Sequence, residues 1–551
     1  MAFINTGRNE AVQGLRKGNS FYIVLLTLVA ALGGLLFGYD TAVVNGAEEA
    51  LGKYFVLPKP DDFSLLTSSL INQYRWLLVI VLIIVAIIIC VQMIKLLGKN
   101  KGLIVSIILL AALIIWSYFF VAAAIPTNAD GINILQNTAN SIKGFVLASA
   151  LIGCIIGGAL AGTISKNWGR KSGLYIAALS FLISAIGAWK PEAFNFFGVL
   201  PVYSFVIYRI IGGLGVGVAS MISPMYIAEI APAKIRGKLV SFNQFAIIFG
   251  MLIIYFVNYI IAGKGDEQWL TTEGWRWMFF SGVIPAVIFF VLLFLVPETP
   301  RYLAMKGKDD KALKVLAKIG GKDEAQSVLL SIKSTLHETN SPWLSYGSLL
   351  IIVGVLLSVF QQFVGINVVL YYAGNIFRNM GSSTDSSLLQ TIIVGIVNLL
   401  FTVIAIFTVD KFGRKPLMII GSVGMAASMM AIGFLFYSQN LGIAALIFML
   451  IYTAAFALSW GPVCWVLLAE IFPNSIRGAL SIAVAAQWIA NWVVSFTFPV
   501  MNDNVALTNQ FHHGFAYWIY GVMAVLSALF IWKLVPETKG KSLEEIESVW
   551  K

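Results

Sequence analysis

Two ionisable side chains lie inside long apolar stretches of the sequence, where a charge is costly and marks a candidate functional site. Asp40 follows an apolar run that begins at Phe21, and Arg209 opens a glycine-rich run that ends at Gly217. Burial favours the protonated form of a carboxyl group, whereas a nearby guanidinium favours the ionised form. An aspartate that gains and loses Arg209 as a partner would therefore release and bind a proton. The alternative is a permanent ion pair that fixes two helices.

A second group of side chains in apolar stretches consists of amides and aromatic rings. Its members are Gln244, Gln361, Gln362, Asn367, Tyr371, Asn398, Trp465, Gln487 and Trp488, with Asn491 one helical turn after Gln487. Amides both donate and accept hydrogen bonds, and aromatic faces cover apolar C–H groups. Such a set suits an uncharged ligand with many hydroxyl groups, as a sugar has. The alternative is that the amides only join neighbouring helices within the membrane.

The composition restricts the class of protein that carries these residues. Of the 551 residues, 59% are hydrophobic and only 11% are charged, whereas a soluble domain is about 25% charged. A soluble enzyme, a disordered chain and a secreted disulfide scaffold are therefore excluded. The three cysteines, Cys90, Cys154 and Cys464, lie in apolar runs and predict no disulfide framework. We find no metal-ligand spacing, catalytic nucleophile or phosphate loop, so we expect neither a cofactor nor enzymatic activity.

Long apolar runs predict the membrane topology, since a helix needs about 20 mostly apolar residues to cross a bilayer. Lys and Arg residues concentrate in alternate short loops, which favours cytoplasmic placement of both termini in a multi-pass protein of the cell (inner) membrane. Fourteen spans are expected, at roughly 21–45, 76–97, 103–125, 142–164, 173–190, 200–226, 240–262, 277–297, 347–373, 388–409, 416–436, 442–468, 480–500 and 515–535.

Three motifs recur at nearly one offset, which indicates a duplicated chain. They are Ala228–Leu239 with Ala469–Leu480, Trp168–Lys171 with Phe412–Lys415, and Val296–Thr299 with Val535–Thr538. Transporters with such repeats relate two bundles by an axis along the membrane normal. We therefore predict an all-α fold with a six-helix bundle in 1–300, a cytoplasmic helical linker in 301–341, and a second six-helix bundle with a short tail in 342–551.

Two bundles account for twelve spans, so the first half contains two more than the repeat requires. The runs 76–97 and 103–125 fall between its first two repeated spans and are joined by the basic segment Lys95–Lys101. We expect a transmembrane hairpin at about 72–130 that enters and leaves on the outer side. Its runs have no deeply placed charge, which favours an accessory role over a place in the transport path.

The repeated motifs identify the family that the chain resembles. Gly-Arg-Lys turns, the Glu229 to Arg236 motif with its copy, and paired Pro-Glu-Thr segments resemble the sugar porter family of the major facilitator superfamily. The resemblance covers everything except about 60–135. It is strongest to bacterial symporters that carry D-xylose with protons, through Gly33–Ala42, Ser241–Phe245, Gln361–Asn367 and Trp460–Trp465. Facilitative glucose transporters share several of these motifs but lack an acid at the position of Asp40.

The resemblance implies proton-coupled uptake of a monosaccharide, D-xylose or another pentose, by alternating access. It assigns proton coupling to Asp40 and Arg209, and sugar contacts to the amide and aromatic group above, with Phe37 and Trp488 as an apolar wall. The partners would be sugar, proton and lipid bilayer, without nucleic acid, and we expect a functional monomer. The alternatives are a proton-independent hexose or pentose facilitator and, from another class, a membrane sugar sensor.

The repeated cytoplasmic motifs would also supply a gate in which acids and bases latch the two halves together. Its candidates are Glu229, Arg236, Glu470, Arg477, Arg170 and Arg414. Topology alone is the other explanation, because basic residues mark inner loops in any case. Two departures from the family pattern bear on function. Met251 replaces a glutamine near the expected sugar site, and Lys166 replaces an acid in the first Gly-Arg-Lys turn.

Overall fold

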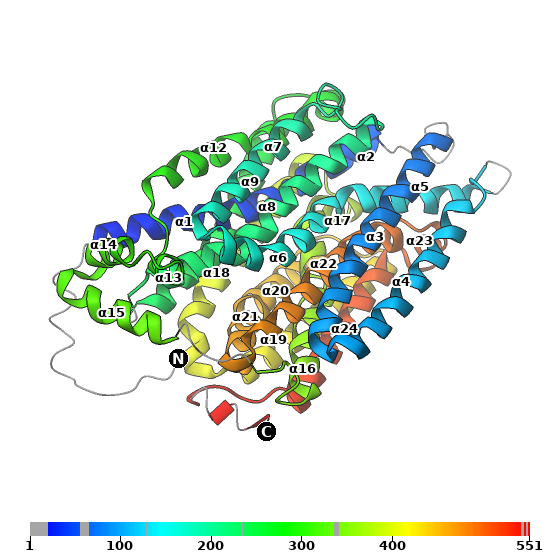
Figure 1. Cartoon of the computed structure of the whole chain (residues 1–551). Helices are drawn as coiled ribbons and strands as arrows, with labels where there is room; N and C mark the ends of the chain where they lie inside the picture. Colours follow the sequence, from blue (N-terminus) through cyan, green and yellow to red (C-terminus); the bar gives the residue numbers. More distant parts are fainter. Residues whose placement is uncertain are drawn as a thin grey trace.

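The protein is a bundle of long helices that lie side by side (Figure 1). The computed structural model describes residues 20–55, 66–127, 131–232, 235–335, 341–541, 545–546 and 549–550, and this part of the chain contains helices and no strand. Fourteen of its helical segments are long and apolar enough to cross a membrane, which confirms the predicted number. The first span extends further than predicted, from Phe21 to Phe55.

The N-terminal half contains the first repeated set of helices. Its first span is interrupted at Val43, which divides an inner helix from an outer one. A second interruption at Ala148 divides the next span in the same way. The helices are α1 (Ser20–Ala42), α2 (Val44–Phe55), α5 (Ile132–Leu147), α6 (Ser149–Asn167), α7 (Arg170–Trp189), α8 (Pro201–Ile230), α9 (Arg236–Ala262), α10 (Glu267–Trp269), α11 (Trp275–Phe280) and α12 (Val283–Leu292).

The C-terminal half repeats this arrangement. Gly365 has a left-handed backbone with φ of 92° and separates the inner and outer parts of its first span, a conformation that glycine adopts at low cost. Its helices are α16 (Ser348–Phe363), α17 (Ile366–Asn379), α18 (Thr384–Phe412), α19 (Arg414–Tyr437), α20 (Ile443–Leu458), α21 (Trp460–Ile471), α22 (Leu480–Asn502), α23 (Val505–Phe511) and α24 (Gly514–Leu534).

Between the halves, the segment predicted as a helical linker contains α13 (Pro300–Met305), α14 (Asp309–Gly320) and α15 (Lys322–Thr335). These short helices lie at the opposite end of the bundle from α2, α5 and α23 (Figure 1). The Gly-Arg-Lys turns that begin α7 and α19 face the Pro-Glu-Thr segments adjoining this end. The distribution of basic residues predicts that the linker end is cytoplasmic and that the α2 end is the outer one.

The inserted hairpin is formed by α3 (Ser68–Leu97) and α4 (Lys99–Ala122) and lies at one edge of the bundle (Figure 1). In α4 the described buried residues are only Gly102, Ser106 and Ser117, all small. Ser106 donates to the carbonyl of Cys90 on α3. A methyl group on Gly102 would meet the backbone of α3 at Ile94, so this glycine permits the close approach. Most of α4 therefore faces outward, as expected of a helix surrounded by lipid.

The two halves meet along α9 with α18, α22 with α5 and α6, and α17 with α2. At the outer end the approach is close enough to restrict side-chain size. A Cβ atom on Gly144 of α5 would collide with the carbonyl oxygen of Phe496 on α22. Asn45 and Tyr255 of the N-terminal half both donate hydrogen bonds to the carbonyl oxygen of Leu370 on α17, at 2.9 and 2.7 Å. The structure is therefore closed on its outer side.

Candidate functional site

The two charges singled out in apolar segments form one ion pair near the middle of the N-terminal half. Arg209 on α8 donates from Nη1 to Oδ1 of Asp40 on α1 at 2.8 Å, and from Nη2 to the Asp40 carbonyl oxygen at 2.8 Å. The guanidinium also lies 5.2 Å from the centre of the Phe279 ring. Two hydrogen bonds and an aromatic face thus hold the arginine in one orientation.

The two partners of this pair differ in accessibility. The Arg209 side chain is 1% exposed, whereas that of Asp40 is 15% exposed. The second carboxylate oxygen of Asp40, Oδ2, is buried without a hydrogen-bond partner in the described part of the chain. One oxygen of Asp40 is therefore held by the arginine, while the other has no partner among the described residues. Small cavities adjoin both residues, one beside Asp40 and one beside Arg209.

The predicted amides of the C-terminal half form a continuous hydrogen-bonded chain. Gln361 on α16 is its centre: its oxygen accepts from Gln487 of α22 and from Gln362, and its nitrogen donates to the carbonyl of Trp460 at 3.1 Å. Asn367, just beyond the Gly365 break, donates to the oxygen of Gln362. The break between α16 and α17 therefore lets amides of both segments converge with α22.

Several buried polar atoms next to this chain have no protein partner among the described residues. They include Oε1 of Gln487 and Nε1 of Trp488, which follow one another on α22. Buried polar groups are normally hydrogen-bonded, and each exception needs an explanation. The Trp488 ring lies 5.7 Å from that of Phe37 on α1, so an apolar wall from both halves stands beside these free atoms. Unused donors and acceptors next to aromatic faces suit a sugar ring.

Tyr371 on α17 connects the amide region with the ion pair. Its side chain interacts with Asn491 of α22 and with Thr41, which follows Asp40 in the sequence. Asn491 in turn accepts a hydrogen bond from Ser495 at 3.3 Å. Sequence patterns could place Tyr371 in the polar group, but they contained no signal for its contact with the neighbour of Asp40.

Three other predicted residues stand apart from the amide chain. Gln244 is half-buried on α9, Asn398 is buried on α18, and Trp465 on α21 is 38% exposed. None of the three hydrogen-bonds to the chain within the described residues. Met251, the departure from the family pattern, is buried on α9 where the backbone of α9 approaches Gly38.

The predicted gate residues form ion pairs inside each half. Arg170 donates to both oxygens of Glu229, at 2.9 and 2.7 Å, and Thr299 donates to Glu229 at 2.6 Å. The copy in the C-terminal half matches this set, with Arg414 and Thr538 on Glu470 at 3.0 and 2.6 Å. Neither pair crosses between the halves in this structure.

Of the two remaining gate candidates, Arg236 is the one with a described side chain, and its hydrogen bond stays within one half. Arg236 donates to the carbonyl of Ala231 at 3.4 Å, within the N-terminal half. The side chain of Arg477 lies outside the described part of the chain. The gate between the halves therefore stays a prediction. It concerns the outward-facing state, in which the cytoplasmic ends of the two halves would be in contact.

The Pro-Glu-Thr segments have a role that the repeat pattern alone did not indicate. Glu298 accepts the backbone N–H groups of Arg170 and Lys171 at 3.1 Å each, at the start of α7. Glu537 does the same for Arg414 and Lys415 at the start of α19. Anions are favoured at helix N-termini, which carry unsatisfied N–H groups and partial positive charge.

The pKa values of these two glutamates shift in opposite directions. Burial raises the pKa of Glu298 above its ordinary value, and its N–H donors only partly offset this. Burial has the same effect on Glu537, but the N–H groups of Lys539, Arg414 and Lys415 outweigh it and lower its pKa. Equivalent positions in the two halves therefore differ in electrostatic environment.

The fold consists of membrane-spanning helices in two repeated halves, with a polar site where the halves meet and an ion pair inside the first half. Such an arrangement defines a transporter of the alternating-access type. The chain belongs to the sugar (and other) transporter family, whose model matches residues 26–550. Membership confirms the family and the fold expected from the repeated motifs.

Individual relatives cover nearly the whole chain. It is 52% identical over 546 residues to a D-xylose-proton symporter of Escherichia coli K12, covering 97% of this chain and 96% of the relative. It is 39% identical over 548 residues to a glucose facilitated diffusion protein of Zymomonas mobilis, covering 98% and 99%. A solved structure of the major facilitator superfamily proton:xylose symporter XylE bound to 6-bromo-6-deoxy-D-glucose matches with a TM-score of 0.70 and 52% identity, covering 97% and 100%.

Proposed function

We propose that this protein is a proton-coupled monosaccharide symporter that takes up D-xylose with a proton by alternating access. The observation that carries the proposal is the Asp40–Arg209 pair, in which one carboxylate oxygen is held and the other is free. The 52% identity to a D-xylose-proton symporter supports both the substrate and the coupling. We further propose that it resides in the inner membrane with both termini in the cytoplasm, and that it catalyses no chemical reaction.

The amide chain and the aromatic wall supply the sugar site in this proposal. Hydroxyl groups of the sugar donate to Oε1 of Gln487 and accept from Nε1 of Trp488, the two atoms without protein partners. The C–H face of the sugar ring packs on Phe37 and Trp488, which belong to different halves. Sugar bound there contacts both halves, so its affinity depends on how the halves are placed.

Coupling follows from the electrostatics of the ion pair. A proton from the outer solution binds to Asp40 and removes the charge that faces Arg209. The buried guanidinium then lacks its anionic partner, and an unpaired buried charge costs several kcal/mol, roughly 3–5 when one partner of a pair is lost. Movement of α1 relative to α8 relieves that cost. When the halves rearrange to face the cytoplasm, Asp40 releases the proton and regains Arg209.

A proton-independent facilitator is the second candidate, because the chain is also 39% identical to a glucose facilitated diffusion protein over 98% of its length. The decisive measurement uses purified protein in liposomes with labelled D-xylose, other pentoses and hexoses. A symporter accumulates sugar above the outer concentration only when the outside is more acidic. Equilibration without accumulation under every pH gradient would favour the facilitator.

Asp40→Asn tests the residue that carries the proposal. We expect sugar binding and sugar exchange to persist and accumulation against a gradient to be lost, because the isosteric amide cannot carry the proton. Asp385→Asn, the same change at an exposed position in the first turn of α18, is the matched control and should leave accumulation intact. Undiminished accumulation by the Asp40 variant would exclude the coupling role.

A further inference from the structure

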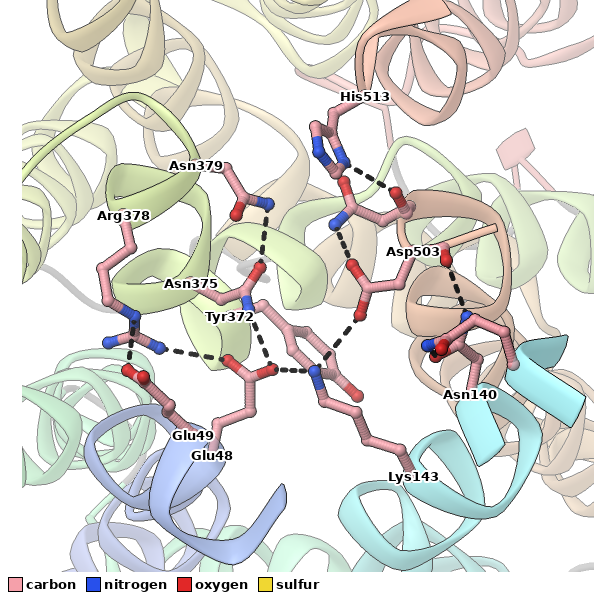
Figure 2. Close-up of polar contacts among 12 residues, drawn as sticks. Glu48, Glu49, Asn140, Lys143, Tyr372, Asn375, Arg378, Asn379, Asp503 and His513 are labelled. Atoms are coloured by element: carbon pink, nitrogen blue, oxygen red, sulfur yellow. Dashed lines mark hydrogen bonds and ion pairs between the residues drawn. The ribbon is translucent and has the colours of Figure 1, made fainter. Parts of the chain in front are cut away.

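A cluster of charged side chains occupies the outer end of the interface between the halves, away from the site described above (Figure 2). Glu48 and Glu49 come from α2, Lys143 from α5 and Arg378 from α17. Asp503 follows the last residue of α22. Acids and bases alternate along the cluster, and its members come from four segments that are far apart in the sequence.

Lys143 is the central cation of this cluster. Its ammonium lies 3.0 Å from Oε1 of Glu48 and 3.2 Å from Oδ2 of Asp503, and Figure 2 shows it between the two carboxylates. The Glu48 side chain is 1% exposed and that of Lys143 is 20% exposed. Glu48 belongs to the same half as Lys143, whereas Asp503 belongs to the other half.

Arg378 makes the reciprocal connection. It belongs to the C-terminal half and lies 2.8 Å from Glu49 and 3.8 Å from Glu48, both of the N-terminal half. Asn375, one turn earlier on α17, donates to Glu48 at 3.2 Å. Each half therefore contributes a cation that pairs with an anion of the other half.

Neutral hydrogen bonds extend the same connection. Asn140 of α5 donates to the backbone carbonyl of Asp503 at 2.7 Å, and Asn504 donates to Asn137 at 2.9 Å. The α22–α23 turn is thus held to α5 by side-chain and backbone contacts together. Charge-assisted hydrogen bonds are about twice as strong as neutral ones, so the ion pairs dominate this region.

The partners of each charge decide what separation of the halves would cost. If the outer ends part, Lys143 keeps Glu48 but loses Asp503, and Arg378 loses both glutamates. Glu48 keeps Lys143, so no fully buried charge is left unpaired in the N-terminal half. Asp503 and Arg378 are 23% and 18% exposed and can exchange their partners for water. The contacts across the interface can therefore break without a prohibitive desolvation cost, as a reversible closure requires.

We propose that Glu48, Glu49, Lys143, Arg378 and Asp503 form an outer latch, which holds the outer ends of the two halves together while the sugar site faces the cytoplasm. The latch must open for sugar to enter from outside. It has no counterpart in the repeated motifs, whose ion pairs stay within one half. The inference rests on the transport function proposed above and adds the residues that set the balance between its two states.

The test is a distance measurement between the outer ends of the halves. Spin labels on Phe196→Cys and Asn440→Cys report this distance, since both residues are exposed in outer loops of different halves. The native cysteines, Cys90, Cys154 and Cys464, are buried. Pulsed electron paramagnetic resonance in nanodiscs then gives the fractions of protein with near and distant outer ends.

Asp503→Asn removes the partner of Lys143 across the interface, and Arg378→Gln removes the cation that pairs with Glu49 across it. Both variants leave the buried Lys143–Glu48 pair in place. We expect each to raise the ratio of distant to near outer ends by about three- to tenfold, as the loss of one hydrogen bond of ordinary net strength would, because water partly screens these partly exposed partners. Lys53→Gln is the matched control, because the partners of Lys53 in the described part of the chain, Glu49 and Glu267, belong to its own half. Should Arg378→Gln fail to fold, Asp503→Asn decides alone.

An unchanged ratio in the folded latch variants, or an equal rise in Lys53→Gln, would overturn the latch. The result is independent of the substrate and the proton. Normal D-xylose accumulation with an unchanged ratio would leave the proposed function intact and remove only the latch. If the variants raise the ratio and the unaltered protein accumulates no sugar, the latch would be supported and the proposed function overturned.

Discussion

The outer and cytoplasmic ends of the two halves use ion pairs in different ways. At the outer end Lys143 and Arg378 pair with acids of the opposite half. At the cytoplasmic end Arg170 and Arg414 pair with acids of their own half. Contacts across the interface favour one placement of the halves, whereas contacts within a half stiffen that half in every placement. The difference teaches that the duplicated motifs build two rigid bodies, and that unrepeated residues decide how those bodies meet.

The largest effect should come from a bulky side chain that keeps the outer ends of the two halves from closing. Gly144→Leu places a side chain where even a Cβ would meet the backbone of Phe496. Overpacking costs about 1–3 kcal/mol, roughly five- to 150-fold in population, so D-xylose uptake should fall by about that factor. Gly162→Leu on α6 is the control, since nothing lies within 4 Å of a Cβ there. Equal uptake by both variants in liposomes would show that the outer ends need not approach so closely.

An intermediate effect is expected from Glu229→Gln and Glu470→Gln. Each removes a charge-assisted contact inside one half, which should destabilise the protein by about 2 kcal/mol and lower its thermal unfolding temperature. The outer distance distribution should stay as in the unaltered protein. If these glutamates instead latch the halves in the outward-facing state, the same variants would shift that distribution toward near outer ends. One pair of measurements thus separates the two roles.

The smallest effect concerns the two helix N-termini at the cytoplasmic end. The pKa of Glu537 is lowered on folding, so its ionised form stabilises the protein above its ordinary pKa, and that stability is lost as the pH falls through the lowered value. The pKa of Glu298 is raised, so its stabilising form is the protonated one, lost as the pH rises. At neutral pH, Glu537→Gln should cost up to about 1 kcal/mol and Glu298→Gln less.

Thermal unfolding at pH 7 and at acidic pH checks this prediction. The penalty of Glu537→Gln should shrink at acidic pH, where the native carboxyl is itself protonated. Equal penalties for the two variants at both pH values would mean that the equivalent glutamates are in matched environments after all.

Much of the fold could be predicted from the sequence because the membrane imposes its own pattern. Apolar runs of sufficient length identified all fourteen spans, and the recurring motifs identified the two halves. The pairing of Asp40 with Arg209 could be anticipated because each is a lone charge in an apolar segment. That Gln361 and Gln487 meet could be anticipated in the same way, because both are amides in apolar segments. The full amide chain could not, because Asn367 joins it only through the break in the helix at Gly365.

The outer latch could not be predicted in this way. Glu48, Lys143 and Asp503 lie near the ends of spans, where charges are common, and they are separated by long stretches of sequence. Nothing in the pattern shows which acid a given base will meet. The same limit applies to Glu229, which could pair with an arginine of its own half or of the other until the structure placed Arg170 beside it.

The hairpin was predicted to be an accessory outside the transport path, and its role stays a prediction. The structure nevertheless seats α3 on both halves. Near its outer end the carbonyl of Leu70 accepts from Tyr203 of α8 at 2.6 Å. Near its inner end Gln92 accepts from Ser481 of α22 at 3.3 Å, and Lys95 lies 5.8 Å from the Trp343 ring, just before α16.

Because of that placement, we expect the thickness of the bilayer to influence how the two halves are positioned. The apolar run of α3, at about 76–97, extends over roughly 33 Å at 1.5 Å per residue, close to the hydrocarbon core of about 30 Å. A hydrophobic stretch that becomes too long for a thinner membrane responds by changing its tilt. Because the two ends of α3 rest on different halves, a change in tilt pushes one half relative to the other. The length of the lipid acyl chains should therefore shift the balance between conformations with near and with distant outer ends. The hairpin would transmit this effect to the two halves.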